Sequence, residues 1–182
     1  MSNTIRLRWV LVGLLVAALI AVVFQISKPA ETAVETETAN ISTGACSAEN
    51  PGVTLVVDFG AAADESPIQK CVGEFSGNGW QLFEAAEVEV EGTAKYPEFA
   101  CRIAGLPTSE AQDCGENASF DKGYWSYFYA DAAKAADWTM SPVGAVDRNP
   151  ACGEFEGWVY VASDDASATP SVSAKPFTCL AD

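Results

Sequence analysis

The sequence predicts an α+β domain in which one main helix covers a face of a mixed sheet, stapled by disulfide bonds and preceded by an N-terminal transmembrane helix. Three observations predict this. An uncharged apolar run opens the chain, short β-branched or aromatic segments follow around a single helical pattern, and six cysteines are spread over the rest of the 182 residues. This length suffices for one membrane segment and one domain.

The first 26 residues predict a membrane anchor. Residues 1–8 contain Arg6 and Arg8, and residues 9–26 are apolar except for Gln25 and carry no charge. About 18 apolar residues approach the minimum for a helix that crosses a bilayer. Basic residues before the run favour a cytoplasmic N-terminus and an exported C-terminal domain. We therefore expect a single-pass cell-membrane protein with its domain outside, or a secreted protein if the segment is cleaved.

Two segments have the composition of linkers. Residues 27–45 are rich in Thr, Ala and Glu, and residues 163–182 form an acidic, then Ser- and Pro-rich tail that ends in a cysteine. Such stretches bury too little apolar surface to offset the entropy of ordering them. We expect a flexible tether and a loose tail around a domain at 46–162.

The cysteines predict a disulfide framework, because an even number in a small exported domain is typical of one. No CxxC pair and no histidine accompany them, which argues against a zinc site. Six cysteines allow 15 complete pairings, and the sequence favours only the bridge that closes the shortest loop, between 101 and 114. The six are Cys46, Cys71, Cys101, Cys114, Cys152 and Cys179.

The elements of the domain follow from residue patterns. A helix is expected from Asn78 or Gly79 to near Val88, because apolar residues recur at helical spacing there. Strands are expected where β-branched or aromatic residues run or alternate. These stretches are 53–59, 88–91, 99–103, 123–130 and 155–161.

Charge and composition exclude several functions. The net charge of −15 argues against nucleic acid as a partner, because phosphate binding needs clustered basic residues. The absence of histidine removes the usual general base. No nucleotide-binding or Ca²⁺-binding motif is present. We expect a protein that is not an enzyme and requires no cofactor.

The aromatic stretch 124–129 is the unusual feature of the domain. In a strand, Trp125, Tyr127 and Tyr129 share one face, while Tyr124 and Phe128 share the other. Only one face can pack on the helix, so the other face would present aromatic side chains to a flat, partly apolar ligand or to a protein. The alternative is that both faces are covered, the second by the loop around Trp138.

Five segments resemble the C-terminal β-domain of the transcobalamin and intrinsic-factor family, and the stand-alone form of that domain in exported actinobacterial proteins. They are VTLVVDFG at 53–60, YPEFACRIAGLP at 96–107, YWSYFY at 124–129, SPVGAVDRNP at 141–150 and GEFEGWVY at 153–160. The resemblance implies a β-grasp-like fold.

The resemblance also implies a ligand. In the vitamin carriers this domain closes over cobalamin, which lies between it and a helical barrel. By position, Trp125, Ser141, Val143 and Gly144 would face the corrin ring. This chain has no such barrel, so a helical partner protein or a transporter would supply the other half. The ligand-binding residues that we predict in all are Trp125, Tyr127, Tyr129, Trp138, Ser141, Val143 and Gly144.

Three functions remain, and each predicts a different surface. A membrane-tethered module that binds cobalamin, another corrinoid or another flat cofactor predicts an open aromatic groove beside Trp125. A surface protein–protein interaction domain predicts a flat apolar patch. A hydrolase based on carboxylates predicts two acidic side chains that converge in a pocket, one with a strongly shifted pKa. We favour them in that order.

Overall fold

The computed structural model describes residues 40–115, 122–134, 137–162, 165 and 167–179. The predicted anchor at 9–26 and most of the predicted tether lie outside the described residues. Within the described part of the chain, no helix has the length and apolar character needed to cross a membrane.

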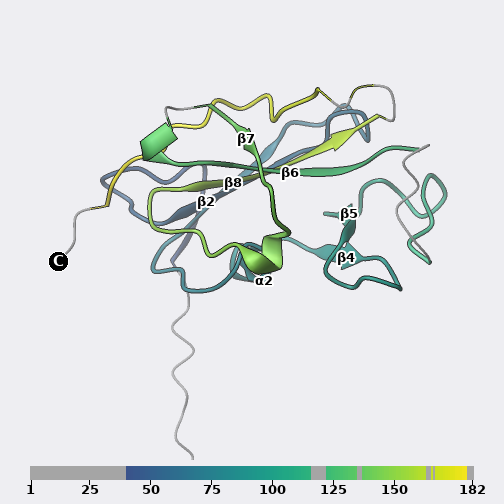
Figure 1. Ribbon diagram of the computed structural model, residues 1–182, viewed down its shortest axis with the longest axis horizontal. Coiled ribbons are helices and arrows are strands. Elements are labelled where there is room, and N and C mark those ends of the chain that lie inside the picture. The colour runs from purple at the N-terminus through teal and green to yellow at the C-terminus, as the bar shows by residue number, and fades with distance from the viewer. Residues whose placement is uncertain (1–39, 116–121, 135–136, 163–164, 166, 180–182) are drawn as a thin grey trace, which may run out of the picture. The chain divides into compact units, whose positions relative to one another are not determined.

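A six-stranded mixed sheet forms the body of the domain (Figure 1). Its strands lie in the order β1-β3-β2-β8-β6-β7. The central pair, β2 and β8, is parallel, and the other neighbours are antiparallel. The strands are β1 (Ile41–Thr43), β2 (Val53–Asp58), β3 (Ile68–Val72), β6 (Tyr124–Ala130), β7 (Thr139–Met140) and β8 (Phe155–Val161). The predicted mixed sheet is therefore confirmed.

A second, two-stranded sheet pairs β4 (Val90–Gly92) with β5 (Ala100–Ile103). These strands were expected at 88–91 and 99–103. The first is shifted, because Val88 is buried in the core while the ladder pairs only from Val90 onward.

The single described α-helix, α2 (Gln81–Ala85), lies inside the range predicted from Asn78 or Gly79 to near Val88, but it begins later and ends earlier. The side chain of Asn78 accepts hydrogen bonds from the main-chain N–H groups of Trp80 (3.1 Å) and Gln81 (2.9 Å), which satisfies donors that the first turn leaves free. Leu82 and Phe83 are fully buried against the sheet. The helix is short because Glu87 adopts a left-handed φ of 55° and turns the chain toward β4.

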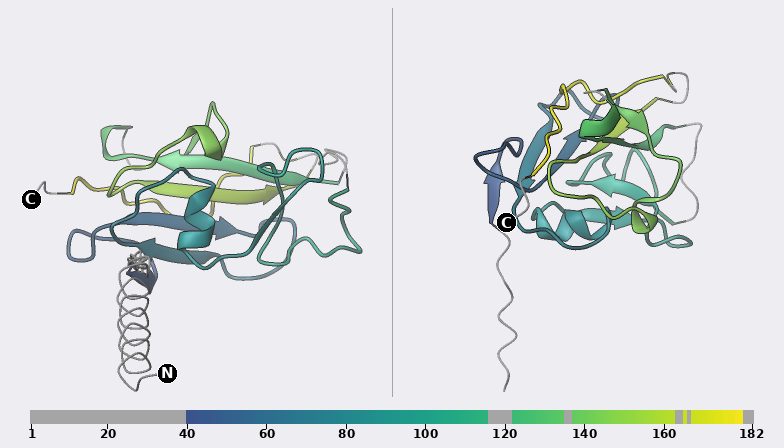
Figure 2. Two further views of the ribbon diagram at one scale, coloured as in Figure 1. Left: turned by 90° about the horizontal axis from the view of Figure 1, so that it is seen from below. Right: turned by 60° about the vertical axis from the view of Figure 1, so that its left-hand side comes forward.

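Both faces of the sheet are covered. The helix α2 covers one face, and the C-terminal segment 167–179 crosses the other (Figures 1 and 2). Along β2, Leu55 and Val57 belong to the helix-side core, while Val56 packs under the C-terminal segment. All six residues of β2 are buried, as expected for a central strand between two layers.

The prediction of a loose C-terminal tail is wrong for the described residues of that segment. Ala174 is 1% exposed. The Asp58 carboxylate accepts hydrogen bonds from the main-chain N–H (2.7 Å) and the hydroxyl (2.5 Å) of Ser171. The indole N–H of Trp138 donates to the Val172 carbonyl (2.7 Å). Partners distant in sequence order this segment, and composition alone does not reveal them.

The tether also ends earlier than predicted. Residues 41–43 form β1 and pair with β3, and the Gly44 N–H donates to the Gln69 carbonyl (2.9 Å). The domain therefore starts before Cys46. A three-residue edge strand with two polar side chains has no recognisable pattern of its own, and its pairing with β3 gives it order.

Three disulfides close the framework: Cys46–Cys71, Cys101–Cys114 and Cys152–Cys179. The favoured bridge, Cys101–Cys114, is confirmed. The other two attach the N-terminal and C-terminal segments to the body. They close loops of 25 and 27 residues. Each is expected to stabilise the fold by about 3 kcal/mol, by restricting the unfolded chain.

Candidate functional site

Strand β6 is covered on both of its faces. Trp125 is 4% exposed and packs edge-on against Phe59 and Tyr160 on the helix side. On the other side, Phe128 is buried with Trp138 next to it. The expectation of an open aromatic face is therefore wrong, and the alternative, with both faces covered, is what the structure shows.

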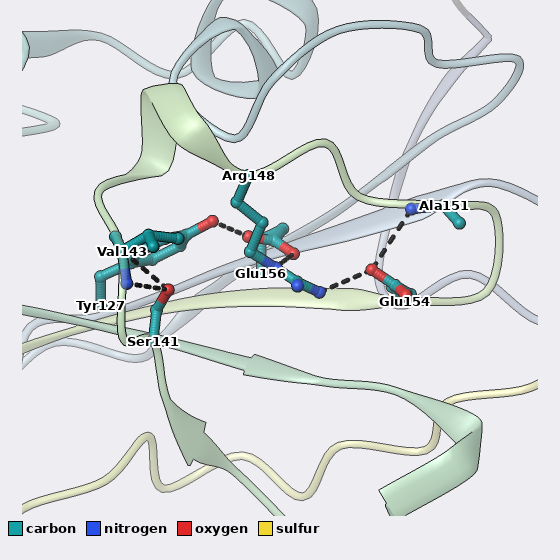
Figure 3. Close-up of polar contacts among 7 residues, drawn as sticks. All are labelled: Tyr127, Ser141, Val143, Arg148, Ala151, Glu154 and Glu156. Carbon is teal, nitrogen blue, oxygen red and sulfur yellow. Dashed lines mark hydrogen bonds and ion pairs between the residues drawn. The ribbon is translucent and has the colours of Figure 1, made fainter.

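An opening remains along the edge of β6, because β7 leaves it early. Pairing ends at Phe128–Met140, after which the Ser141 N–H donates to the Tyr127 carbonyl (2.9 Å). The Ser141 hydroxyl then donates to the Val143 carbonyl (2.8 Å) and accepts from the Val143 N–H (3.4 Å), which turns the chain away from the sheet (Figure 3). The 3₁₀-helix Ala145–Asp147 follows this turn.

The space left between this turn and the start of β5 is a cleft of about 290 Å³, here named the edge cleft. This volume is near the lower end for small-molecule sites. Aromatic and aliphatic side chains line most of it, and Glu98 is the one charged residue among the described lining residues. The lining residues are Glu98, Phe99, Ala100, Tyr124, Trp125, Ser126, Tyr127, Met140, Ser141, Val143, Gly144, Ala145 and Trp158.

Five of the seven predicted ligand-binding residues line the edge cleft: Trp125, Tyr127, Ser141, Val143 and Gly144. They come from β6 and from the turn after β7, which are separated in sequence and adjacent in the fold.

The other two predicted residues lie elsewhere. The Tyr129 ring packs under the Arg148 guanidinium, 3.9 Å from the ring centroid. Trp138 lies on the opposite face of the sheet, beside Phe155 and a second cavity formed with residues 169–174. Trp138 follows the aromatic strand closely in sequence, but the sheet separates its side chain from the edge cleft.

Sequence reasoning missed several residues of the edge cleft. Trp158 enters from β8 because it lies directly opposite Tyr127 in the antiparallel pair, and the two rings stack with centroids 4.6 Å apart. Phe99 enters from the loop before β5. Both lie in segments that carry the family resemblance, which could therefore have identified them as site residues. No sequence feature indicates Met140.

Beside the edge cleft, four polar side chains form a partly buried group around the fully buried Glu156, here named the Arg148 cluster: Tyr127, Arg148, Glu154 and Glu156 (Figure 3). Arg148 binds Glu156 through Nε (2.8 Å) and Glu154 through a terminal nitrogen (2.6 Å). The Tyr127 hydroxyl donates to the second oxygen of Glu156. Tyr127 thus belongs to both the edge cleft and the cluster.

Burial shifts the titration of this cluster. Removal from water raises the pKa of Glu156 to about 7, although Arg148 and the Tyr127 hydroxyl both stabilise its charged form. The same burial, together with the neighbouring Glu156 charge, raises the pKa of Tyr127 well above its ordinary value. Tyr127 therefore remains a hydrogen-bond donor at any ordinary pH.

The hydrolase alternative predicts two converging carboxylates, one with a shifted pKa. Glu154 and Glu156 are close together and the pKa of Glu156 is raised, but their placement differs from that of a catalytic pair. Arg148 bridges Glu154 and Glu156, and the Glu156 side chain is fully buried. Neither carboxylate lines the edge cleft. The geometry fits a structural ion-pair network. No group of three or more His, Cys, Asp or Glu with metal-binding geometry occurs among the described residues.

Two buried indole donors lack partners. The Nε1–H groups of Trp125 and Trp158 are shielded from solvent, and no acceptor among the described residues reaches them. Both tryptophans line the edge cleft. Buried polar groups are almost always hydrogen-bonded, so two such donors beside one cleft are uncommon.

Comparisons with protein-family models, with curated proteins and with solved structures found no match to this chain.

Proposed function

We propose that the protein is a membrane-tethered, extracytoplasmic ligand-binding module, and that the edge cleft is its binding site. The observation that carries the proposal is the convergence of Trp125, Tyr127, Ser141, Val143 and Gly144 on one concave, mainly apolar space. Concave apolar sites with a few polar groups are typical of small-molecule binding.

The resemblance to the transcobalamin β-domain makes cobalamin, or another corrinoid, the first ligand to test. The mixed sheet with α2 on one face suits the β-grasp-like fold that this resemblance implies. A cleft of about 290 Å³ holds only part of a molecule of that size. The remainder would lie against a partner, either a helical protein or a transporter.

The second candidate function is a protein–protein interaction domain without a small ligand. One observation favours it: three large apolar side chains, Phe99, Met140 and Val143, are exposed where they line the edge cleft. Exposed apolar groups gathered at one place mark interaction sites. The concave form of the site favours the first function over a flat docking patch.

A titration of the full-length chain in detergent, with its disulfides formed, tests the proposal. Cobalamin is added while tryptophan fluorescence and corrin absorbance are followed together. We expect saturable quenching, because Trp125 and Trp158 border the site. The Val143→Asp variant, which places a charge in the edge cleft, should abolish this quenching.

The matched control is Ser173→Asp, which adds the same charge at an exposed position on the opposite face of the sheet. It should bind as the unmodified protein does. Equal loss in both variants would contradict the placement of the site. No quenching by millimolar cobalamin would show that the chain does not bind it alone, and would favour the interaction domain.

A further inference from the structure

We propose that the edge cleft binds an extended peptide, neutral or basic in charge, which adds as a strand to the outer edge of β6. The inference rests on the proposed function in taking the edge cleft as the binding site, and it names a class of occupant different from a corrinoid. The partner is a segment of another protein chain.

The edge cleft runs along a strand edge, and its lining shows this. Tyr124, Trp125, Ser126 and Tyr127 are consecutive, and all four line it. Their side chains alternate between the two faces of the sheet. A single space that touches four consecutive residues of a strand lies along the edge of that strand.

This edge presents free main-chain groups. The Tyr127 carbonyl accepts from Ser141 and therefore points away from β8. Main-chain groups alternate in direction along a strand, so every odd-numbered residue of β6, Trp125 included, directs its N–H and C=O away from β8. Beyond Ser141 no strand continues β7. No hydrogen bond among the described residues reaches the outward N–H or C=O of Trp125. An extended peptide placed opposite Trp125 would pair with both groups, as strand-addition ligands do.

Exposed apolar side chains surround the same edge. Four large hydrophobic side chains are exposed among the described residues, and three of them line the edge cleft: Phe99 (41% exposed), Met140 (53%) and Val143 (46%). An edge strand with apolar neighbours is a template for pairing with another chain unless charges or a cover block it. Alternate side chains of a peptide would contact these three residues.

The unpaired indole donors fit the same occupant. Trp125 and Trp158 line the edge cleft, and each holds a buried indole N–H with no acceptor among the described residues. A peptide supplies carbonyl oxygens, which are neutral acceptors. A carboxylate ligand would supply acceptors too, but it would lie near Glu98, and no basic residue is found among the described lining residues.

Charge selects the kind of peptide. The chain carries a net charge of −15, so a second copy of it is repelled. The chain's own tether contains Glu31, Glu35 and Glu37, and it joins the domain next to β1, at the edge of the sheet opposite to β6 and β7. A neutral or basic segment from a different protein is the occupant that this charge distribution accepts.

The test uses the full-length chain in detergent and a blocked eight-residue peptide in which valine alternates with threonine or lysine. Calorimetry gives the affinity, and NMR reports the indole N–H signals of Trp125 and Trp158. The control is the same peptide N-methylated at its three central amides, which keeps every side chain and removes the strand donors. We expect N-methylation to weaken binding by about tenfold or more, and the indole signals to move only with the unmodified peptide.

Two variants check the charge argument. Glu98→Lys should weaken binding of the lysine peptide several-fold and strengthen binding of a version with glutamate in place of lysine. Glu49→Lys makes the same charge change in the turn beside β1 and should leave both affinities unchanged. Equal binding of the methylated and unmodified peptides would overturn the inference. Binding of cobalamin without binding of peptide would overturn it and leave the proposed function standing, whereas binding of neither would overturn both.

Discussion

Tyr127 stacks on Trp158, with ring centroids 4.6 Å apart and an interplanar angle of 24°, while its hydroxyl donates to the fully buried Glu156. One side chain therefore joins the edge cleft to the Arg148 cluster. The ring of Tyr127 forms part of the lining of the edge cleft, and its hydroxyl satisfies one oxygen of a carboxylate that water does not reach. Changes at the hydroxyl and at the ring should consequently have separable effects.

Replacing Tyr127 by Phe removes the hydroxyl and keeps the ring. We expect the free energy of unfolding to fall by about 1–3 kcal/mol, because one oxygen of buried Glu156 loses its donor. The stack on Trp158 should survive, so the edge cleft keeps its shape. Urea denaturation measures the effect. Tyr96→Phe, at a tyrosine that is 54% exposed, is the control and should change stability by less than about 0.5 kcal/mol.

The raised pKa of Glu156 makes stability depend on pH. In the folded protein its pKa is about 7, above the ordinary glutamate value of 4.5. Between these two values the folded state holds a proton that the unfolded state has released, so stability falls as pH rises from about 4.5 through 7. The glutamine of Glu156→Gln cannot titrate. Over this pH window the unmodified protein should lose up to about 3 kcal/mol more of its free energy of unfolding than the variant does.

Chemical denaturation at pH 5, 6, 7 and 8 measures this difference, with Glu154→Gln as the matched control. The control removes the carboxylate of Glu154, which also contacts Arg148 but is partly exposed. Parallel pH profiles for the unmodified protein and Glu156→Gln would contradict the assignment of this slope to Glu156.

The sequence predicted those strands and the helix that are specified by their own residues. β2, β6 and β8 are long, apolar or aromatic runs, and α2 carries its own side-chain cap at Asn78. It missed β1, β3 and β7. Each of these is short or carries polar residues, and each is ordered by pairing with a neighbouring strand, as β1 is by β3.

The candidate site was also predicted only in part. The resemblance implied that Trp125 and Val143 face one ligand, and both residues line the edge cleft. Alternation along β6 correctly separated its two faces, but it did not reveal that the C-terminal segment covers the second one. The path of residues 167–179 depends on the Asp58–Ser171 hydrogen bonds and on Cys179, and neither pairing can be inferred from composition.

Gly157 gives a direct measure of how closely the C-terminal layer packs on the sheet. A Cβ at this position would lie 2.5 Å and 2.7 Å from two ring carbons of Trp138, and 3.1 Å from Pro170. Gly157→Ala should therefore displace Trp138 and destabilise the fold by about 1–3 kcal/mol. Gly144→Ala is the matched control, because the nearest atoms to its Cβ are 3.9 Å away. Thermal unfolding of both variants makes the comparison, and equal stabilities would contradict close packing at Gly157.

The disulfide between Cys152 and Cys179 holds the end of the C-terminal segment, where the Phe177 N–H also donates to the Gly153 carbonyl (3.2 Å). Replacing both cysteines by alanine should lower stability by about 3 kcal/mol and loosen this end first. Chymotrypsin should then cut after Phe177 at least about tenfold faster, which mass spectrometry of the reduced digest detects as loss of the last five residues. The corresponding double alanine variant of Cys101 and Cys114 removes a bridge near β5 and should leave cleavage at Phe177 slow under conditions where both variants remain folded. Equal acceleration in both would indicate global unfolding and would contradict a local role for the Cys152–Cys179 bridge.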